Sequence, residues 1–167
     1  MLKKVTSKPI AVLTNGSLLS RHDVRSDLYG ADLVSIKIDT VDENLHRMLN
    51  RPHKSLSLKD ILDGIVEFSK EYNGKLITET MLVNNINDTT MDARNVAKFI
   101  SKLNISKAYI SIPIRPPTEP WVKPPPENKV VGFYQEFSKV LNKDVELLLG
   151  FEGPEFIGTR DNPINDL

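Results

Sequence analysis

The sequence predicts a parallel α/β protein: one sheet of about five strands with helices on its outer face. Four apolar runs, each ending in a polar or proline-marked cluster, alternate with stretches of helical spacing. That alternation is typical of βα units, whose right-handed crossovers place successive parallel strands side by side. Such an array corresponds to half of an eight-fold barrel or two-thirds of a six-fold barrel, and a sheet of this size can also stand open.

The amino-terminal half is expected to contain two strands and three helices. Its elements, in chain order, are a strand over 10–13, a short helix over 20–29, a strand over 31–38, a helix over 42–49 and a helix capped by Ser57. Gly16 allows a tight turn after the first strand. In the third helix, apolar residues recur at helical spacing until Asn73 and Gly74 end it.

The carboxyl-terminal half continues the same alternation. Its expected elements are a strand over 76–83, a helix capped by Asp88 or Thr89, a strand over 108–114, a helix over about 127–141 and a strand over 145–150. In the loop 115–126, six of the twelve residues are proline, so this loop should be extended and stiff. Residues 151–167 contain turn formers and show no periodicity, and all of 1–167 is interpreted as a single domain.

Composition limits the function classes. The 167 residues include 22 acidic and 22 basic side chains, so no net charge attracts nucleic acid or a membrane surface. No apolar stretch approaches the roughly 20 residues that cross a bilayer, and the amino terminus lacks a signal-peptide core, so a cytoplasmic protein is the default. Because the chain has no cysteine, it can form no disulfide, thiolate zinc site or cysteine-ligated iron–sulfur cluster by itself.

Polar residues follow or interrupt the first three strands, and ligand-handling residues of parallel sheets gather at the carboxyl ends of strands. Thr14 and Asn15 either contact a ligand or only form a turn. Ser35, Lys37 and Asp39 alternate in an otherwise apolar strand, where a lysine is costly without a partner. Either Lys37 pairs with Asp39 for structure alone, or these residues and Glu79 of the next strand line a polar cavity.

The loops carry further candidates. Arg115 precedes two prolines, and a stiff loop can hold a guanidinium against a carboxylate or phosphate. Trp121 in the same loop could stack on a ligand or plug the end of the barrel, or the loop could simply pack its apolar residues on the sheet. Arg51 and His53 flank Pro52; either could contact an anionic ligand or simply be solvated.

Two other groups of polar residues favour a structural interpretation. The segment 84–88 could be an amide-rich binding loop, but a strand-to-helix connection that caps the next helix is the simpler reading. The three histidines are too scattered to form a metal site, and His46 is expected on the surface of a helix.

Taken in order, several segments resemble the radical S-adenosylmethionine superfamily, in particular the archaeal iron–sulfur oxidoreductase branch related to the wyosine-base tRNA-modifying enzymes. The segments that carry the resemblance are 11–16, 31–39, 50–53, 79–83 with Asn87 and Asp88, 113–122 and 151–153. Enzymes of this kind have a partial (β/α)6 barrel. The resemblance implies that this chain is the carboxyl-terminal half of such a barrel. The three-cysteine motif for a 4Fe–4S cluster and the glycine-rich segment that binds the methionine amino group have no counterpart here, which suggests a split gene, an interrupted gene or a truncated sequence.

The resemblance also implies roles for individual residues. Residues expected along the S-adenosylmethionine cleft are Thr14, Asn15, Ser35, Lys37, Asp39, Met81 and Pro113. Residues expected toward the substrate are Glu79, Arg115 and Trp121. Neither catalytic nor metal-binding residues are expected in this chain.

Three functional hypotheses follow. The first is a fragment or subunit of a radical S-adenosylmethionine enzyme, inactive alone, whose cluster comes from a missing amino-terminal half; RNA enters as a substrate only by analogy with the family. The second is a non-catalytic binding or scaffold domain that keeps the fold. The third is an unrelated half-barrel enzyme that uses Lys37 and Glu79 for acid–base chemistry. Since half a barrel leaves strand edges unpaired, we expect self-association, binding of the missing half, or coverage by the tail 151–167.

Overall fold

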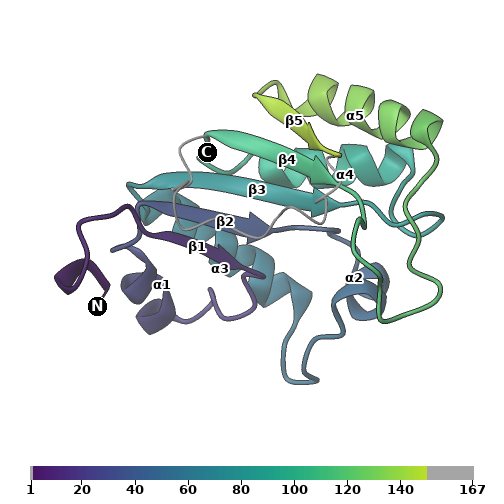
Figure 1. Cartoon of the computed structure of the whole chain (residues 1–167). Coiled ribbons are helices and arrows are strands. Elements are labelled where there is room, and N and C mark those ends of the chain that lie inside the picture. The colour runs from purple at the N-terminus through teal and green to yellow at the C-terminus, as the bar shows by residue number, and fades with distance from the viewer. Residues whose placement is uncertain (1, 150–167) are drawn as a thin grey trace.

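The computed structural model describes residues 2–149, which form a five-stranded parallel sheet in the order β1-β2-β3-β4-β5 (Figure 1). The strands are β1 (Ala11–Thr14), β2 (Leu33–Lys37), β3 (Lys75–Met81), β4 (Lys107–Ser111) and β5 (Val145–Leu148). Strand order equals chain order and every pair is parallel, as in a barrel wall built from consecutive βα units. The predicted fold class is therefore confirmed.

The helices occupy the predicted positions. They are α1 (His22–Leu28), α2 (Glu43–Asn50), α3 (Leu58–Glu71), α4 (Thr90–Ile100) and α5 (Glu127–Leu141), preceded by a 3-10 turn, η1 (Leu2–Lys4), that the sequence analysis did not predict. Two helices begin at side-chain caps. The Ser57 hydroxyl accepts from the Asp60 backbone N–H, and Thr89 forms a capping box with Asp92.

Four strands end earlier than predicted: β2 by one residue, β3 and β5 by two, and β4 by three. β4 ends at Ser111 rather than at Ile114, because Pro113 has no N–H to continue the ladder. β3 ends at Met81 rather than at Val83, because the Val83 N–H donates to the Asn87 side chain instead of a strand. The predicted strand end at Gly150 and the segment 151–167 lie outside the described residues.

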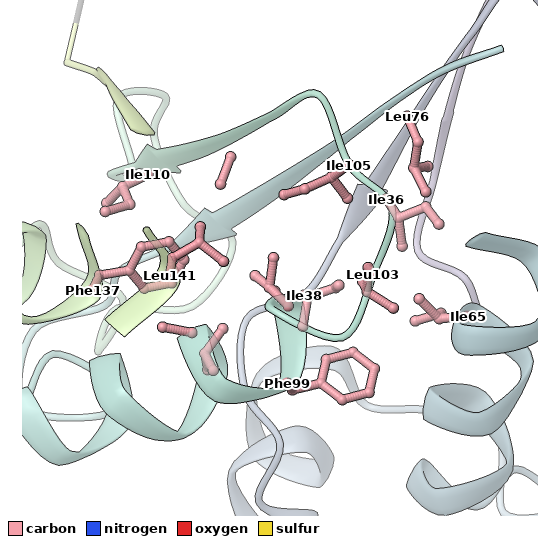
Figure 2. Close-up of a cluster of buried hydrophobic side chains, with 14 of the residues drawn as sticks. Ile36, Ile38, Ile65, Leu76, Phe99, Leu103, Ile105, Ile110, Phe137 and Leu141 are labelled. Atoms are coloured by element: carbon pink, nitrogen blue, oxygen red, sulfur yellow. The ribbon is translucent and has the colours of Figure 1, made fainter. Parts of the chain in front are cut away.

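The hydrophobic core lies on one face of the sheet. The strand residues of the core are Val34, Ile36, Leu76, Ala108, Ile110 and Val145, which the register places on the same face. Side chains from α3, α4 and α5, such as Ile65, Phe99 and Phe137, pack against them (Figure 2). These helices therefore cover a single face, as expected for the outside of a barrel wall.

The opposite face, here called the inner face, carries a different set of residues. Its side chains along the three central strands are Leu33, Ser35, Lys37, Lys75, Ile77, Glu79, Met81, Lys107, Tyr109 and Ser111, by the alternation of the strands. Lys75 and Lys107 lie at the amino ends of their strands, and Lys37 and Ser111 lie at the carboxyl ends. Within residues 2–149, no helix is both long and apolar enough to cross a membrane.

Candidate functional site

A row of polar side chains crosses the inner face from the carboxyl end of β2 to β5. The register places Lys37 beside Glu79, Glu79 beside Tyr109, and Tyr109 beside Glu146. The Ser111 hydroxyl donates a hydrogen bond of 2.7 Å to Glu79 Oε1, which orients that carboxylate. The row thus presents an ammonium, two carboxylates and a phenol on one surface.

Asp39 connects the end of β2 to β3. Its side chain is 2% exposed and lies 3.2 Å from the Lys37 ammonium through Oδ1. The same oxygen accepts from the Met81 N–H at 2.9 Å, and Oδ2 accepts from the Asn50 amide at 3.1 Å. Asp39 therefore fixes Lys37 at the inner face, and the pair predicted from the sequence is present.

In the loop 82–88, the side chains of Asn87 and Asp88 form hydrogen bonds with backbone groups. Asn87 is fully buried; its amide donates to the carbonyls of Asp39 and Met81, each at 2.9 Å. Asp88 is also buried, accepts from the Asn85 N–H, and pairs with Lys129 of α5 at 2.9 Å. The segment is thus a structural connection, as the simpler interpretation of the sequence held.

A pocket of about 260 Å³ opens beside the carboxyl end of β2. Its apolar wall comes from Ile38, the loop residue Leu56 and the α3 residues Leu58, Ile61, Leu62 and Ile65. Its polar lining is Asn15, Ser17, Lys37, Asp39, Thr40, His46, Asn50, Arg51 and His53. It is slightly smaller than the roughly 300–1,000 Å³ typical of small-molecule sites.

The proline-rich loop 115–126 contacts the edge of this pocket. Arg51 Nη1 donates to Glu119 Oε1 at 2.7 Å. This contact raises the pKa of Arg51. The Arg51 guanidinium and, less strongly, Trp121 hold the pKa of Glu119 below its usual range. The ion pair therefore joins two loops that lie 68 residues apart in sequence.

The structure brings some predicted site residues together and separates others. Asn15, Lys37 and Asp39 line the pocket beside β2. Arg115, on the exposed loop after β4, is not part of its lining. The register puts Ser35, Glu79 and Met81 on the inner face with Lys37. Pro113 is half-buried just beyond β4. Trp121 lies beside Glu119.

Thr14 and Asn15 both contribute to a turn. Thr14 pairs with Ile36, which places it on the helix-covered face, and its hydroxyl accepts from the Gly16 N–H at 3.1 Å. Asn15 Oδ1 accepts from the Ser17 N–H at 3.0 Å, so its amide nitrogen remains for the pocket. Gly16 has a φ of +70°, the left-handed conformation that the turn requires.

Sequence reasoning missed four polar residues of the pocket lining: Ser17, Thr40, His46 and Asn50. His46 was expected on the surface, but it is half-buried and its Nε2 atom is fully enclosed. A sequence signal could have found it. His46 and Asn50 are four residues apart on the helix that begins soon after Asp39, and residues i and i+4 of a helix share a face.

The residues of this chain do not suit both of the implied cofactors. A 4Fe–4S cluster requires cysteine thiolates, and the sequence has none, so this chain does not fit a cluster. Within residues 2–149 no group of three or more histidine or acidic side chains is placed to hold a metal ion. The inner-face row does suit a zwitterionic nucleoside, because it offers both charge signs and an aromatic ring.

Curated relatives of the chain are known by sequence. It is 46% identical over 150 residues to a UPF0026 protein of Methanocaldococcus jannaschii, a match that covers 89% of this chain and 47% of the relative. It is also 30% identical over 109 residues to a GTPase Obg of Brachyspira hyodysenteriae, of which it covers 16%. The chain thus spans about half the length of the first relative and less of the second. No protein-family model matches the sequence.

Solved structures share the fold at low sequence identity. A radical SAM methyltransferase from Sphaerobacter thermophilus matches 84% of this chain with a TM-score of 0.64 and 16% identity, over 40% of its own length. A domain of pyruvate-formate lyase-activating enzyme from Bacteroides vulgatus also gives 0.64 at 16% identity, over 82% of this chain and 79% of that domain. SuiB of Streptococcus suis bound to S-adenosylmethionine gives 0.59 at 9% identity, over 84% of this chain and 32% of SuiB. The sheet described here therefore has the fold of a part of these radical SAM proteins.

Proposed function

We propose that this chain supplies part of the S-adenosylmethionine and substrate cleft of a radical S-adenosylmethionine enzyme, and that it acts with a cysteine-bearing polypeptide. The observation that carries this proposal is the polar row on the inner face of a sheet whose fold is shared with radical SAM proteins. One of these, SuiB, was solved with S-adenosylmethionine bound. The match to only part of each neighbour's length agrees with a partial cleft.

The chain's own residues have binding roles in this proposal. Lys37, held by Asp39, faces the ligand's carboxylate, and Glu79, oriented by Ser111, faces its ammonium group. S-adenosylmethionine supplies its sulfonium chemistry only once the partner adds the cluster that this cysteine-free chain does not hold. The residues here orient the ligand and fix its charges, and they do not react.

The finer assignment is to the iron–sulfur oxidoreductase branch related to the wyosine-base enzymes, with an RNA base as substrate. The ordered segments 31–39, 50–53 and 113–122 support it. The zero net charge gives no independent support for RNA, so the electrostatic attraction to such a substrate would have to come from the partner.

The test is co-expression of this chain with a segment that carries a three-cysteine motif from a longer relative. After anaerobic reconstitution, we expect cluster absorbance and cleavage of S-adenosylmethionine, measured by chromatography of its products. Lys37→Met and Glu79→Gln should each weaken S-adenosylmethionine binding about tenfold or more, since each removes a charged contact. Lys75→Met is the matched control, because Lys75 is exposed at the amino end of β3 on the same face.

Each outcome distinguishes the hypotheses. Cleavage that depends on Lys37 and Glu79 but not on Lys75 supports the proposal. A complex that binds S-adenosylmethionine without cleaving it favours the non-catalytic binding domain. No complex and no S-adenosylmethionine binding would contradict both.

A further inference from the structure

The pocket beside β2 is a second candidate site, adjacent to the inner-face row, with which it shares Lys37. One wall consists of α3 side chains such as Ile61 and Ile65, which belong to the helix-covered side of the sheet. The opposite lining is polar and comes from the β1–α1 turn, α2 and the α2–α3 loop. A concave apolar floor with a few convergent polar groups is the usual form of a small-molecule site.

Hydrogen-bond donors dominate the polar lining. Asp39 is the one carboxylate among the described residues that line the pocket. Both of its oxygens already accept bonds, from Met81, Lys37 and Asn50. A guanidinium, an ammonium, two imidazoles and two amides therefore face the cavity with no free carboxylate, and such a lining favours a ligand that accepts hydrogen bonds and carries negative charge.

The two histidines strengthen this conclusion. His53 Nδ1 accepts from the Ser55 N–H at 3.2 Å, so a neutral His53 carries its proton on Nε2 and can donate it. Nε2 of His46 is enclosed, and no partner reaches it from the described part of the chain. A buried imidazole nitrogen is costly to leave without a partner, but this atom has no surface open to the pocket, so the rest of the His46 ring forms the lining.

Arg51 occupies a conformation that few arginines adopt. It caps the carboxyl end of α2 with a φ of 45°, in the left-handed region, directly before Pro52. A left-handed residue is a common way to end a helix, and Asn142 ends α5 in the same way. At the end of α2 this conformation directs Arg51 to the edge of the pocket, where the carboxylate of Glu119 contacts the guanidinium.

We propose that this pocket binds an oxyanion, the carboxylate or phosphate group of a small molecule, through Arg51 and His53, with His46 closing the inner end. Glu119 is the internal competitor: its carboxylate pairs with Arg51 until the ligand's oxyanion displaces it. The proposal does not rest on S-adenosylmethionine chemistry, and the site can exist whether or not the chain belongs to a radical enzyme.

The test is a titration of the full chain with inorganic phosphate, followed by the NMR signals of the histidine ring protons at constant pH. The three histidines include an internal reference, because His22 lies on α1 and is not part of the pocket lining. We expect saturable shifts of the His46 and His53 signals and none of the His22 signals. Equal shifts of all three, or no shift at His46 and His53, would overturn the proposal.

Variants separate the site from general anion binding. Arg51→Asn removes the guanidinium but tolerates the left-handed backbone, and it should weaken phosphate binding about tenfold or more. Arg47→Gln is the matched control, since Arg47 lies on the same helix, pairs with Glu43, and is absent from the pocket lining. Glu119→Gln should tighten phosphate binding about two- to fivefold, because the carboxylate that competes with phosphate for Arg51 is lost. Unchanged affinity in Arg51→Asn would refute the assignment.

A parallel titration with malonate identifies the source of the oxyanion. Tighter binding of phosphate assigns the pocket to a phosphorylated molecule, and tighter binding of malonate assigns it to a carboxylic acid. Binding of neither by the folded wild-type chain contradicts the proposal. Failure of the phosphate titration leaves the S-adenosylmethionine test unaffected, so the two proposals can fail separately.

Discussion

At the scale of single residues, Asn87 joins the carboxyl ends of β2 and β3. Its side chain makes three hydrogen bonds to backbone groups, those of Val83, Asp39 and Met81. An amide can do this because it offers both a donor and an acceptor. The position of Asp39, and through it of Lys37, therefore depends on a residue that touches neither candidate ligand.

Asn87→Ala should lower the free energy of unfolding by about 2–4 kcal/mol, because it leaves three buried backbone groups without partners. The measurement is urea denaturation followed by circular dichroism. Asn95→Ala is the control: Asn95 is exposed on α4, and alanine is the better helix former, so stability should stay the same or rise slightly. A loss below about 0.5 kcal/mol for Asn87→Ala would show that water replaces the amide.

At the scale of elements, α3 packs unusually close to the segment before α1. A Cβ atom added at Gly64 would lie 2.3 Å from the Ser20 backbone nitrogen and 2.4 Å from the Leu19 carbonyl carbon. Leu19 is itself almost fully buried, and Arg25 donates to its carbonyl at 2.8 Å. The wall of the pocket that α3 forms is therefore set by backbone contact.

Gly64→Ala should destabilise the chain by about 1–3 kcal/mol, although alanine favours a helix by about 1 kcal/mol, because the backbone of Leu19 and Ser20 must move. Gly132→Ala in α5 is the matched control: nothing lies within 4 Å of its added Cβ, so the same exchange should stabilise by about 0.5–1 kcal/mol. Thermal unfolding of both variants tests the pair. Equal effects of the two substitutions would contradict the close approach.

At the scale of the whole molecule, the described sheet has two edges, β1 and β5, and its helices cover one face. Leu13 on β1 is 76% exposed, and its register partner Ser35 places it on the inner face. An exposed edge strand with an apolar side chain is a template for pairing with another chain. The proposed cysteine-bearing partner, or a second copy, would cover it.

Leu13→Lys should therefore reduce association while leaving the free energy of unfolding within about 0.5 kcal/mol of the wild-type value, since the side chain is exposed. Sedimentation velocity over a range of concentrations measures self-association, and co-purification measures binding of the partner segment. Met91→Lys, at a residue that is 56% exposed on α4, is the control and should associate as the wild type does. If the wild type is a monomer at every concentration and binds no partner, the edge has no such role.

Much of the fold could be predicted because its signals are local. Apolar runs gave the five strands, helical spacing gave α3 to α5, and the Thr89 cap was one of two predicted alternatives. Two of the errors lie at strand ends, where Pro113 has no N–H for the ladder and Asn87 accepts the Val83 N–H instead. The Lys37–Asp39 pair was also predictable, since two residues that alternate on one strand share a face.

The sequence by itself determined the class of fold, the alternation of its elements and the absence of any cysteine to hold a cluster. The reason is that propensity and periodicity are properties of short segments, and composition is a property of the sequence as a whole. Only the tertiary structure decided that His46, Asn50 and Arg51 meet Asn15 around one pocket, and that Glu119 reaches Arg51 from a distant loop. The physical reason is that such meetings depend on crossover geometry and helix packing, which bring together residues with no regular spacing in the chain.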